Sequence, residues 1–130
     1  LFRLLGSQRQ AALDLTAVIA RTVFVPGLTF WGGTILRDRL NLPRPYEQLD
    51  IRPLIHKDTR GHSFPSRHVF SSAVISCAFL YTVPCLGAIG LLITVWLAVM
   101  RVLGGVHFPR DVIAGFCIGL LSGWVGFVLL

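Results

Sequence analysis

Four apolar stretches, separated by short polar blocks, follow one another along this chain of 130 residues. They occupy approximately residues 11–36, 64–83, 85–103 and 111–130. A helix needs about 20 mostly apolar residues to cross a bilayer. The pattern therefore predicts an all-α fold, a polytopic bundle of four membrane-spanning helices.

The first stretch is the least apolar of the four. It contains Asp14 and Arg21, which lie seven residues apart and so share a helix face. We expect these two side chains to pair or to face the interior of the bundle. We also expect the Pro26-Gly27 pair to kink this helix.

The link between the second and third stretches, residues 83–85, is short and uncharged, so these two helices are expected to form an antiparallel hairpin. Alternating crossings then place the polar extramembrane loop 37–63 and the turn 104–110 on one face of the membrane. The C-terminus falls on the other face. All three polar blocks of the chain are therefore predicted to meet at one membrane face.

Glycines recur every four residues on the last stretch, at Gly115, Gly119 and Gly123. Small residues at this spacing let helix backbones approach closely within lipid. Asp111 lies one step earlier on the same stripe, so its carboxylate is predicted to point into the bundle.

Composition supports a membrane protein with an anionic ligand. Charged residues make up 14% of the chain, against about 25% in soluble domains, and the natural division is a single domain spanning residues 1–130. The chain begins with Leu, so we expect an N-terminally incomplete fragment. The net charge is +6, and seven of the 12 basic side chains lie in the 37–67 region, which favours anionic headgroups or substrates. No fold that binds nucleic acid fits these apolar segments.

His107 and Asp111 are the first candidate pair for chemistry. A carboxylate that binds one imidazole nitrogen fixes the tautomer and leaves the other nitrogen free as a nucleophile. Pro109, between them, suits the first turn of a helix. The pair alone is equally consistent with a polar cap on that helix.

The block Pro65-Ser66-Arg67-His68 begins the second stretch. Backbone N–H groups at a helix start, beside a hydroxyl and a guanidinium, can bind an anion, and His68 could donate a proton to a leaving oxygen. The alternative is an ordinary Ser66 N-cap. Ser72 and Ser76 continue from His68 at four-residue steps, so we expect this face to lie inside the bundle.

Arg37, Arg44 and Arg101 come from different helix ends on the same face. Guanidinium groups can bind phosphate oxygens in pairs. The alternative is flanking positive charge, which is common beside membrane spans.

These blocks resemble the three motifs of the type 2 phosphatidic acid phosphatase superfamily, membrane lipid phosphatases that usually have six spanning helices. The matching residues are Arg37 and Arg44-Pro45, then Pro65-Ser66-Arg67-His68, then Arg101, His107 and Asp111. The chain departs from the family pattern where it has Arg37 for Lys, Arg67 for Gly and Met100 for Ser. Its four stretches match the last four helices of the family.

The resemblance implies a role for each of these residues. His107 would attack phosphorus, Asp111 would orient His107, and His68 would protonate the leaving lipid oxygen. The phosphate oxygens would be bound by Arg37, Arg44, Ser66, Arg67 and Arg101. The family works without a metal or other cofactor, so neither is expected here.

The leading hypothesis is a metal-independent phosphatase of the cell membrane that acts on a lipid phosphate or diphosphate. Phosphatidic acid, phosphatidylglycerol phosphate and undecaprenyl diphosphate are the candidate substrates. The rival is a non-enzymatic membrane protein that binds anionic lipid headgroups. The family implies an extracytoplasmic site, whereas the basic loop alone would favour the cytoplasm. We expect the extracytoplasmic side, because catalysis accounts for several of those arginines.

Overall fold

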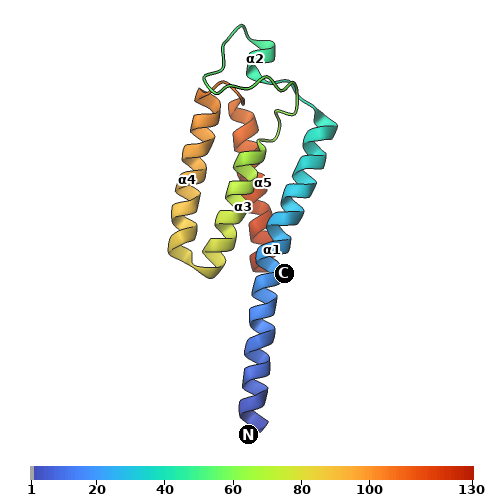
Figure 1. The fold of residues 1–130 in the computed structure, drawn as a ribbon, viewed down its shortest axis with the longest axis vertical. Coiled ribbons are helices and arrows are strands. Elements are labelled where there is room, and N and C mark those ends of the chain that lie inside the picture. The colour runs from blue at the N-terminus through green and yellow to red at the C-terminus, as the bar shows by residue number, and fades with distance from the viewer. Residues whose placement is uncertain (1) are drawn as a thin grey trace.

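The structure, a computed structural model that describes residues 2–130, is helical throughout its regular elements (Figure 1). This confirms the predicted all-α class. The elements, in chain order, are α1 (Phe2–Leu40), α2 (Pro45–Gln48), α3 (Arg67–Thr82), α4 (Pro84–Leu103), α5 (Pro109–Trp124) and the π-helical turn η1 (Val125–Leu129).

Three of the four predicted spans are long and apolar enough to cross a membrane. They are α1, within the window Arg3–Gln48, α4 at Pro84–Leu103, and α5 with η1 at Pro109–Leu129. The fourth, α3, has 16 residues and a length of about 24 Å, less than the roughly 30 Å hydrocarbon core. It starts at Arg67 rather than at the predicted residue 64, because the backbone at Ser66 is still extended (φ −68°, ψ 112°).

The first helix is longer than predicted at both ends. It continues through Pro26 and ends at Leu40, where Asn41 adopts a left-handed φ of 42°. Basic side chains in its last turn favour this extension, since they complement the helix dipole. Arg37 therefore lies on a helix and not in the polar loop that was predicted to begin there.

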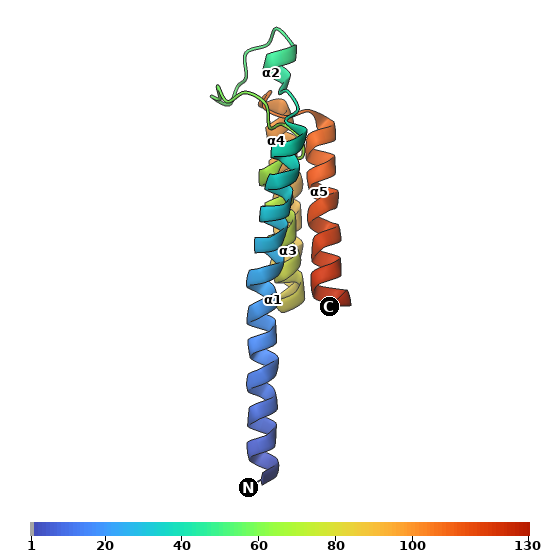
Figure 2. The same ribbon diagram turned by 90° about the vertical axis from the view of Figure 1, so that its right-hand side faces the viewer.

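α3 is the central helix of the bundle. It packs most extensively against α4 and α5, and also against α1 (Figures 1 and 2). Val83 alone joins α3 to α4, which confirms the predicted hairpin. At the other end of the bundle, α2 and its loop lie beside the end of α1 and the start of α5 (Figure 1). The predicted meeting of the polar blocks at one end is thus confirmed.

The glycine stripe of α5 lies against α3, as predicted. Gly115, Gly119 and Gly123 are all buried. A Cβ at Gly119 would lie 2.4 Å from the Cβ of Ala73, and one at Gly115 would lie 2.8 Å from the carbonyl oxygen of Ser66. These contacts leave no room for a side chain, so the stripe brings the start of α5 next to the start of α3.

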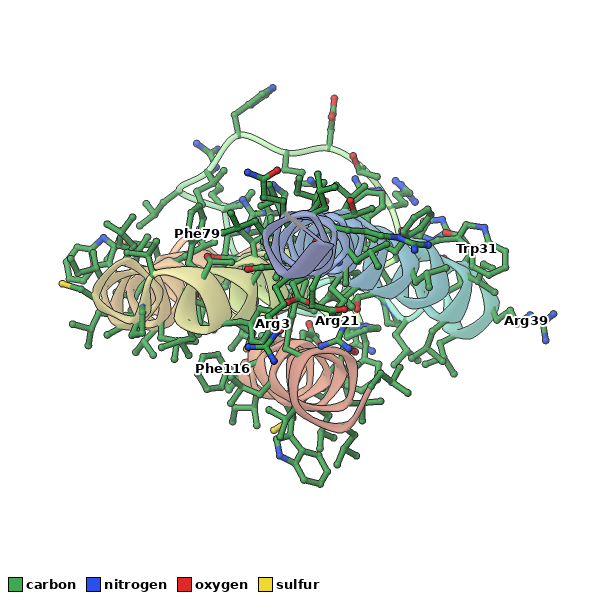
Figure 3. All side chains as sticks on the ribbon, turned by 90° about the horizontal axis from the view of Figure 1, so that it is seen from below. Arg3, Arg21, Trp31, Arg39, Phe79 and Phe116 are labelled. Carbon is green, nitrogen blue, oxygen red and sulfur yellow. The ribbon has the colours of Figure 1, made fainter. Side chains whose placement is uncertain are left out.

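The N-terminal half of α1 extends beyond the far end of the bundle (Figures 1 and 2). Of the two alternatives expected for Asp14 and Arg21, pairing is wrong, and only Arg21 turns toward the bundle. Asp14 accepts a hydrogen bond from Gln10 (3.0 Å), and Arg21 donates to the Tyr81 hydroxyl (3.3 Å) and the Leu130 carbonyl (2.6 Å). Arg21 turns toward the bundle because the Tyr81 hydroxyl on α3 and the Leu130 carbonyl offer acceptors there. Figure 3 labels the Arg21 side chain.

Candidate active site

His107 and Asp111 are both buried at the polar end of the bundle, with 2% and 0% of their surfaces exposed. The Nδ1 atom of His107 lies 3.6 Å from Oδ2 of Asp111, slightly beyond hydrogen-bond distance. The backbone N–H of Phe108 donates to the same Oδ2 (2.8 Å). The carboxylate therefore caps α5 and also faces the imidazole. The two roles that the sequence left open, a helix cap and a partner of His107, are thus combined in Asp111.

Ser63 is a site residue that the sequence did not indicate. Its side chain is fully buried, and its hydroxyl donates to Oδ2 of Asp111 at 2.5 Å. The contact joins positions 48 residues apart, and Ser63 stands in an irregular loop. No spacing rule could have found it, because the loop conformation alone brings the two side chains together.

Ser66 occupies the N-cap position of α3 but makes no side-chain capping bond. Its hydroxyl is fully buried and has no hydrogen-bond partner among the described residues. Its backbone N–H donates to the carbonyl oxygen of Asp111 (2.9 Å), which ties the start of α3 to the start of α5. The ordinary capping role is therefore not seen, and the hydroxyl is free to bind a ligand.

Arg44 holds the two loops of the site together. It is 2% exposed and donates to the carbonyl oxygens of Gly61 (3.0 Å), Val106 (3.0 Å) and His62 (3.3 Å). Most of its donor capacity therefore serves the backbone. Phosphate binding by Arg44 stays a prediction that relies on its remaining N–H groups.

Arg37 and Arg101 have more free donors. Arg37 is buried and donates through Nη1 to the Pro65 carbonyl (3.0 Å). Arg101 keeps its Nε and Nη2 buried, and neither has a partner within residues 2–130. Unpaired buried guanidinium groups are rare, so this arginine is well suited to receive an anion.

His68 and Arg67 are exposed in the first turn of α3, at one end of a groove between α1, α3 and α4. The Arg67 guanidinium lies 5.5 Å from the centre of the Phe30 ring, in a cation–π contact. Ser76, further along the same face, is buried, and Ser72 hydrogen-bonds Thr94 of α4 (2.6 Å). The predicted interior face is therefore correct for the serines, whereas His68 stays open to the groove.

Burial lowers the pKa of His107 below its usual range, and the nearby Arg44 and Arg101 lower it further, against the opposing effect of Asp111. Burial also lowers the pKa of Lys57, as do the surrounding arginines, beginning with Arg44. Lys57 stands in the loop, and the effect of these arginines shows that it lies near them. The lowered pKa keeps His107 neutral at neutral pH, the form that can act as a nucleophile.

The comparisons with known proteins agree with this geometry. A family model described as the PAP2 superfamily matches residues 11–130. The chain belongs to the PAP2 superfamily.

Within the part of the chain that the structure describes, no three His, Cys, Asp or Glu side chains gather as a metal site would require.

Two curated proteins are similar to this chain in sequence. A lipid A 1-phosphatase of Rhizobium etli is 30% identical over 132 residues, which cover 95% of this chain and 54% of the relative. An undecaprenyl-diphosphatase of Sulfolobus acidocaldarius is 31% identical over 86 residues, which cover 65% of this chain and 40% of the relative. The chain thus spans about half the length of the curated relatives it matches.

Two solved structures share the PAP2 fold. Aquifex aeolicus LpxE superposes with a TM-score of 0.76 at 23% identity, over 96% of this chain and 76% of that one. A PAP2-type phosphatidylglycerolphosphate phosphatase from Bacillus subtilis superposes with a TM-score of 0.65 at 25% identity, over 92% and 68%. The predicted family and its membrane-helical architecture are therefore confirmed.

Proposed function

We propose that this PAP2 chain hydrolyses a lipid phosphate or diphosphate through a covalent phosphohistidine on His107, without a metal. One observation carries the proposal. Free donors on Ser66 and Arg101 are buried beside a neutral imidazole and a fixed carboxylate. Buried polar groups without partners are costly, and a phosphoryl group would bind to all of these donors.

The reaction has two steps. Nε2 of His107 attacks phosphorus as the bond to the lipid oxygen breaks, and His68 gives that oxygen a proton. Water then attacks the phosphohistidine, His68 takes a proton from the water, and the P–N bond breaks to release inorganic phosphate. His68 is thus acid first and base second.

Charge stabilisation is assigned to the donors around phosphorus. Arg37, Arg101 and Ser66 bind the oxygens whose charge grows in the transition state. Arg44 contributes its remaining N–H groups, and Arg67 approaches from the groove. Asp111, fixed by Ser63 and Phe108, orients His107 and stabilises its cationic form during attack.

The relatives bear the names lipid A 1-phosphatase, undecaprenyl-diphosphatase and phosphatidylglycerolphosphate phosphatase. We carry this class of substrate over to the chain as lipid phosphates and diphosphates, with phosphatidic acid among the candidates. The alternative is non-enzymatic binding of anionic headgroups. It needs the arginines but gives no role to the buried imidazole of His107, which faces the Asp111 carboxylate. We further propose that the active site faces the extracytoplasmic side.

The test is phosphate release from lipid phosphates in detergent, measured with EDTA present, for the parent and His107→Ala. We expect an active parent, no release by the variant, and inhibition of the parent by vanadate, which mimics five-coordinate phosphorus. His56→Ala, a loop substitution, is the matched control and should keep full activity. Equal release by parent and His107→Ala would rule out the mechanism, and a parent that binds lipid phosphate without releasing phosphate would favour the alternative.

A further inference from the structure

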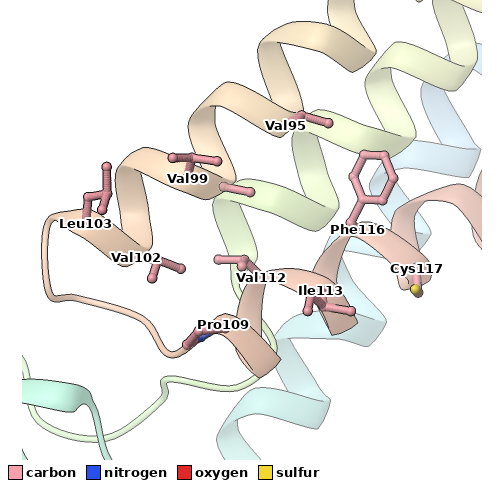
Figure 4. A pocket seen from close by; sticks show the side chains of 10 residues that line it. Val95, Val99, Val102, Leu103, Pro109, Val112, Ile113, Phe116 and Cys117 are labelled. Carbon is pink, nitrogen blue, oxygen red and sulfur yellow. The ribbon is translucent and has the colours of Figure 1, made fainter.

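Two grooves run along opposite faces of the α3–α4 hairpin. The first, which we call the serine groove, has a volume of about 620 Å³ and is lined by α3, α4 and Phe30 of α1. The second, the α4–α5 groove, has a volume of about 380 Å³ (Figure 4). In Figure 3, Phe79 of the serine groove and Phe116 of the α4–α5 groove lie on opposite sides of the hairpin.

The lining of the serine groove changes in character along α3. Arg67 and His68 stand at the end nearest the active site, Ser71 and Ser72 follow, and Phe79 lies further down. From His68 to Phe79 the helix rises by about 16 Å. The order is therefore charge, then hydroxyl, then hydrocarbon, from the membrane face inward.

The hydroxyl zone has an unused donor. The Oγ atom of Ser71 is buried and has no hydrogen-bond partner among the residues described. The nearby serines already have hydrogen-bond partners, since Ser72 bonds to Thr94 (2.6 Å) and Ser76 donates to the carbonyl oxygen of Ser72 (2.8 Å). Ser71 can therefore donate to an acceptor that enters the groove.

The position of His68 decides which groove receives the lipid. The proposed reaction has His68 protonate the leaving oxygen, and that oxygen belongs to the lipid part of the substrate. The lipid must then extend from His68, which lines the serine groove. The lining of the α4–α5 groove, with Val102, Ile113 and Phe116, is apolar apart from the thiol of Cys117, and it contains no histidine or carboxyl group that could protonate an oxygen (Figure 4).

We propose that the serine groove binds the tail of the lipid substrate, with the Ser71 hydroxyl donating to an ester or amide carbonyl of an acyl chain. The inference rests on the proposed function and names its substrate class: an acylated phosphate lipid is preferred over a polyprenyl phosphate. A polyprenyl chain is hydrocarbon from its first carbon, so it would leave the Ser71 hydroxyl buried and unpaired, which is unfavourable. Ile93, which is level with the hydroxyl zone because its neighbour Thr94 bonds to Ser72, and then Ile75 and Phe79 further along the groove contact the hydrocarbon.

The first test fills each groove with an indole ring. Ile93→Trp obstructs the serine groove and Ile113→Trp obstructs the α4–α5 groove. The two isoleucines are matched, since they are 58% and 63% exposed on the lipid-facing surface of neighbouring helices, so neither change disturbs the core. The measurement is kcat/KM in detergent for dioleoyl and dihexanoyl phosphatidic acid.

Ile93→Trp should lower kcat/KM for the dioleoyl lipid about tenfold, mainly through KM, because it displaces the equivalent of roughly two buried methylenes. The dihexanoyl lipid, whose short tails contact less of the groove than dioleoyl tails do, should lose clearly less of its kcat/KM. Ile113→Trp should change neither. Selective loss of the dioleoyl reaction in Ile113→Trp instead, or equal loss of both substrates in Ile93→Trp, would overturn the proposal.

The second test addresses the hydroxyl zone. Ser71→Ala should lower kcat/KM for dihexanoyl phosphatidic acid about fivefold, the loss of one hydrogen bond, and leave farnesyl phosphate unchanged. Equal effects on the two lipids would refute the assignment of Ser71. If the parent hydrolyses neither lipid, the proposed function itself is refuted. If the parent is active and the variants are unaffected, only the assignment of the serine groove to the lipid tail is refuted.

Discussion

At the scale of single residues, the site depends on hydrogen bonds that sequence spacing does not reveal. The chemical groups themselves were predictable, because His68, His107 and Asp111 stand at helix ends in a recognisable order. The supporting contacts were not. Ser63 reaches Asp111 across 48 positions, and Arg44 donates to three carbonyl oxygens in two loops. Such contacts depend on the fold of irregular segments, which no periodicity describes.

Ser63 should matter to catalysis through Asp111. We predict that Ser63→Ala lowers kcat roughly tenfold to a hundredfold, as expected for a lost hydrogen bond to a charged group, with KM little changed. Ser63→Thr, which keeps the hydroxyl, should recover most of the activity. The control is Ser122→Ala, near the far end of α5. Parental kcat in Ser63→Ala would show that the contact does not serve the reaction.

Stability should depend on pH through His107. Its pKa is lowered in the folded protein, so the unfolded chain, which titrates near about 6.5, takes up the proton first. Stability contributed by the neutral imidazole is therefore fully present above that value and declines as the pH falls from it toward the folded pKa. We predict that, below about pH 6.5, the Tm of the parent in detergent falls more steeply with pH than the Tm of His107→Ala. Parallel curves would contradict this assignment.

At the scale of the helices, apolar length and small-residue spacing predicted most of the architecture. Four helices, the α3–α4 hairpin and the packing of α5 on α3 through Gly119 all followed from the sequence. The ends of helices did not, since α1 runs on to Leu40 and α3 starts at Arg67. Helix ends depend on local caps and loop contacts, which contribute little to an apolar pattern.

The glycine stripe offers a matched pair of substitutions. Gly119→Ala should destabilise the bundle by about 1–3 kcal/mol through overpacking, because the new Cβ would lie 2.4 Å from that of Ala73. Gly32→Ala, on α1, has no neighbouring atom within 4 Å and should be neutral or slightly stabilising. Thermal unfolding in detergent measures both. Equal Tm values for the two variants would refute close packing of α5 on α3.

At the scale of the whole molecule, the bundle has two chemically distinct ends. Arg37, Arg101 and His107 gather at one end with the loop that contains Asp58. The other end carries the turn at Val83 and, beyond it, the projecting half of α1 (Figure 1). The α1 helix of 39 residues measures about 58 Å, nearly twice the hydrocarbon thickness. Its N-terminal half must therefore leave the bilayer or tilt strongly within it.

The two ends allow a direct test of orientation. Cys85 is exposed at the end opposite to the active site. We predict that an impermeant thiol reagent, applied to intact cells, labels Asp58→Cys in a protein whose native cysteines are replaced by serine. The same reagent should label a protein that retains only Cys85 after the cells are opened, and not before. The reverse pattern would place the site in the cytoplasm.

The central claim is that hydrolysis passes through a phosphate bound covalently to His107. The most direct test mixes the detergent-solubilised parent with a lipid phosphate that is labelled on phosphorus. The reaction is then quenched rapidly, without acid, and the protein is examined for label. The account predicts a labelled protein that forms within one turnover, loses its label in acid but not in alkali, and carries it on the peptide containing His107, with no label in His107→Ala. Steady release of phosphate with no labelled protein, or label that persists in His107→Ala, would contradict it.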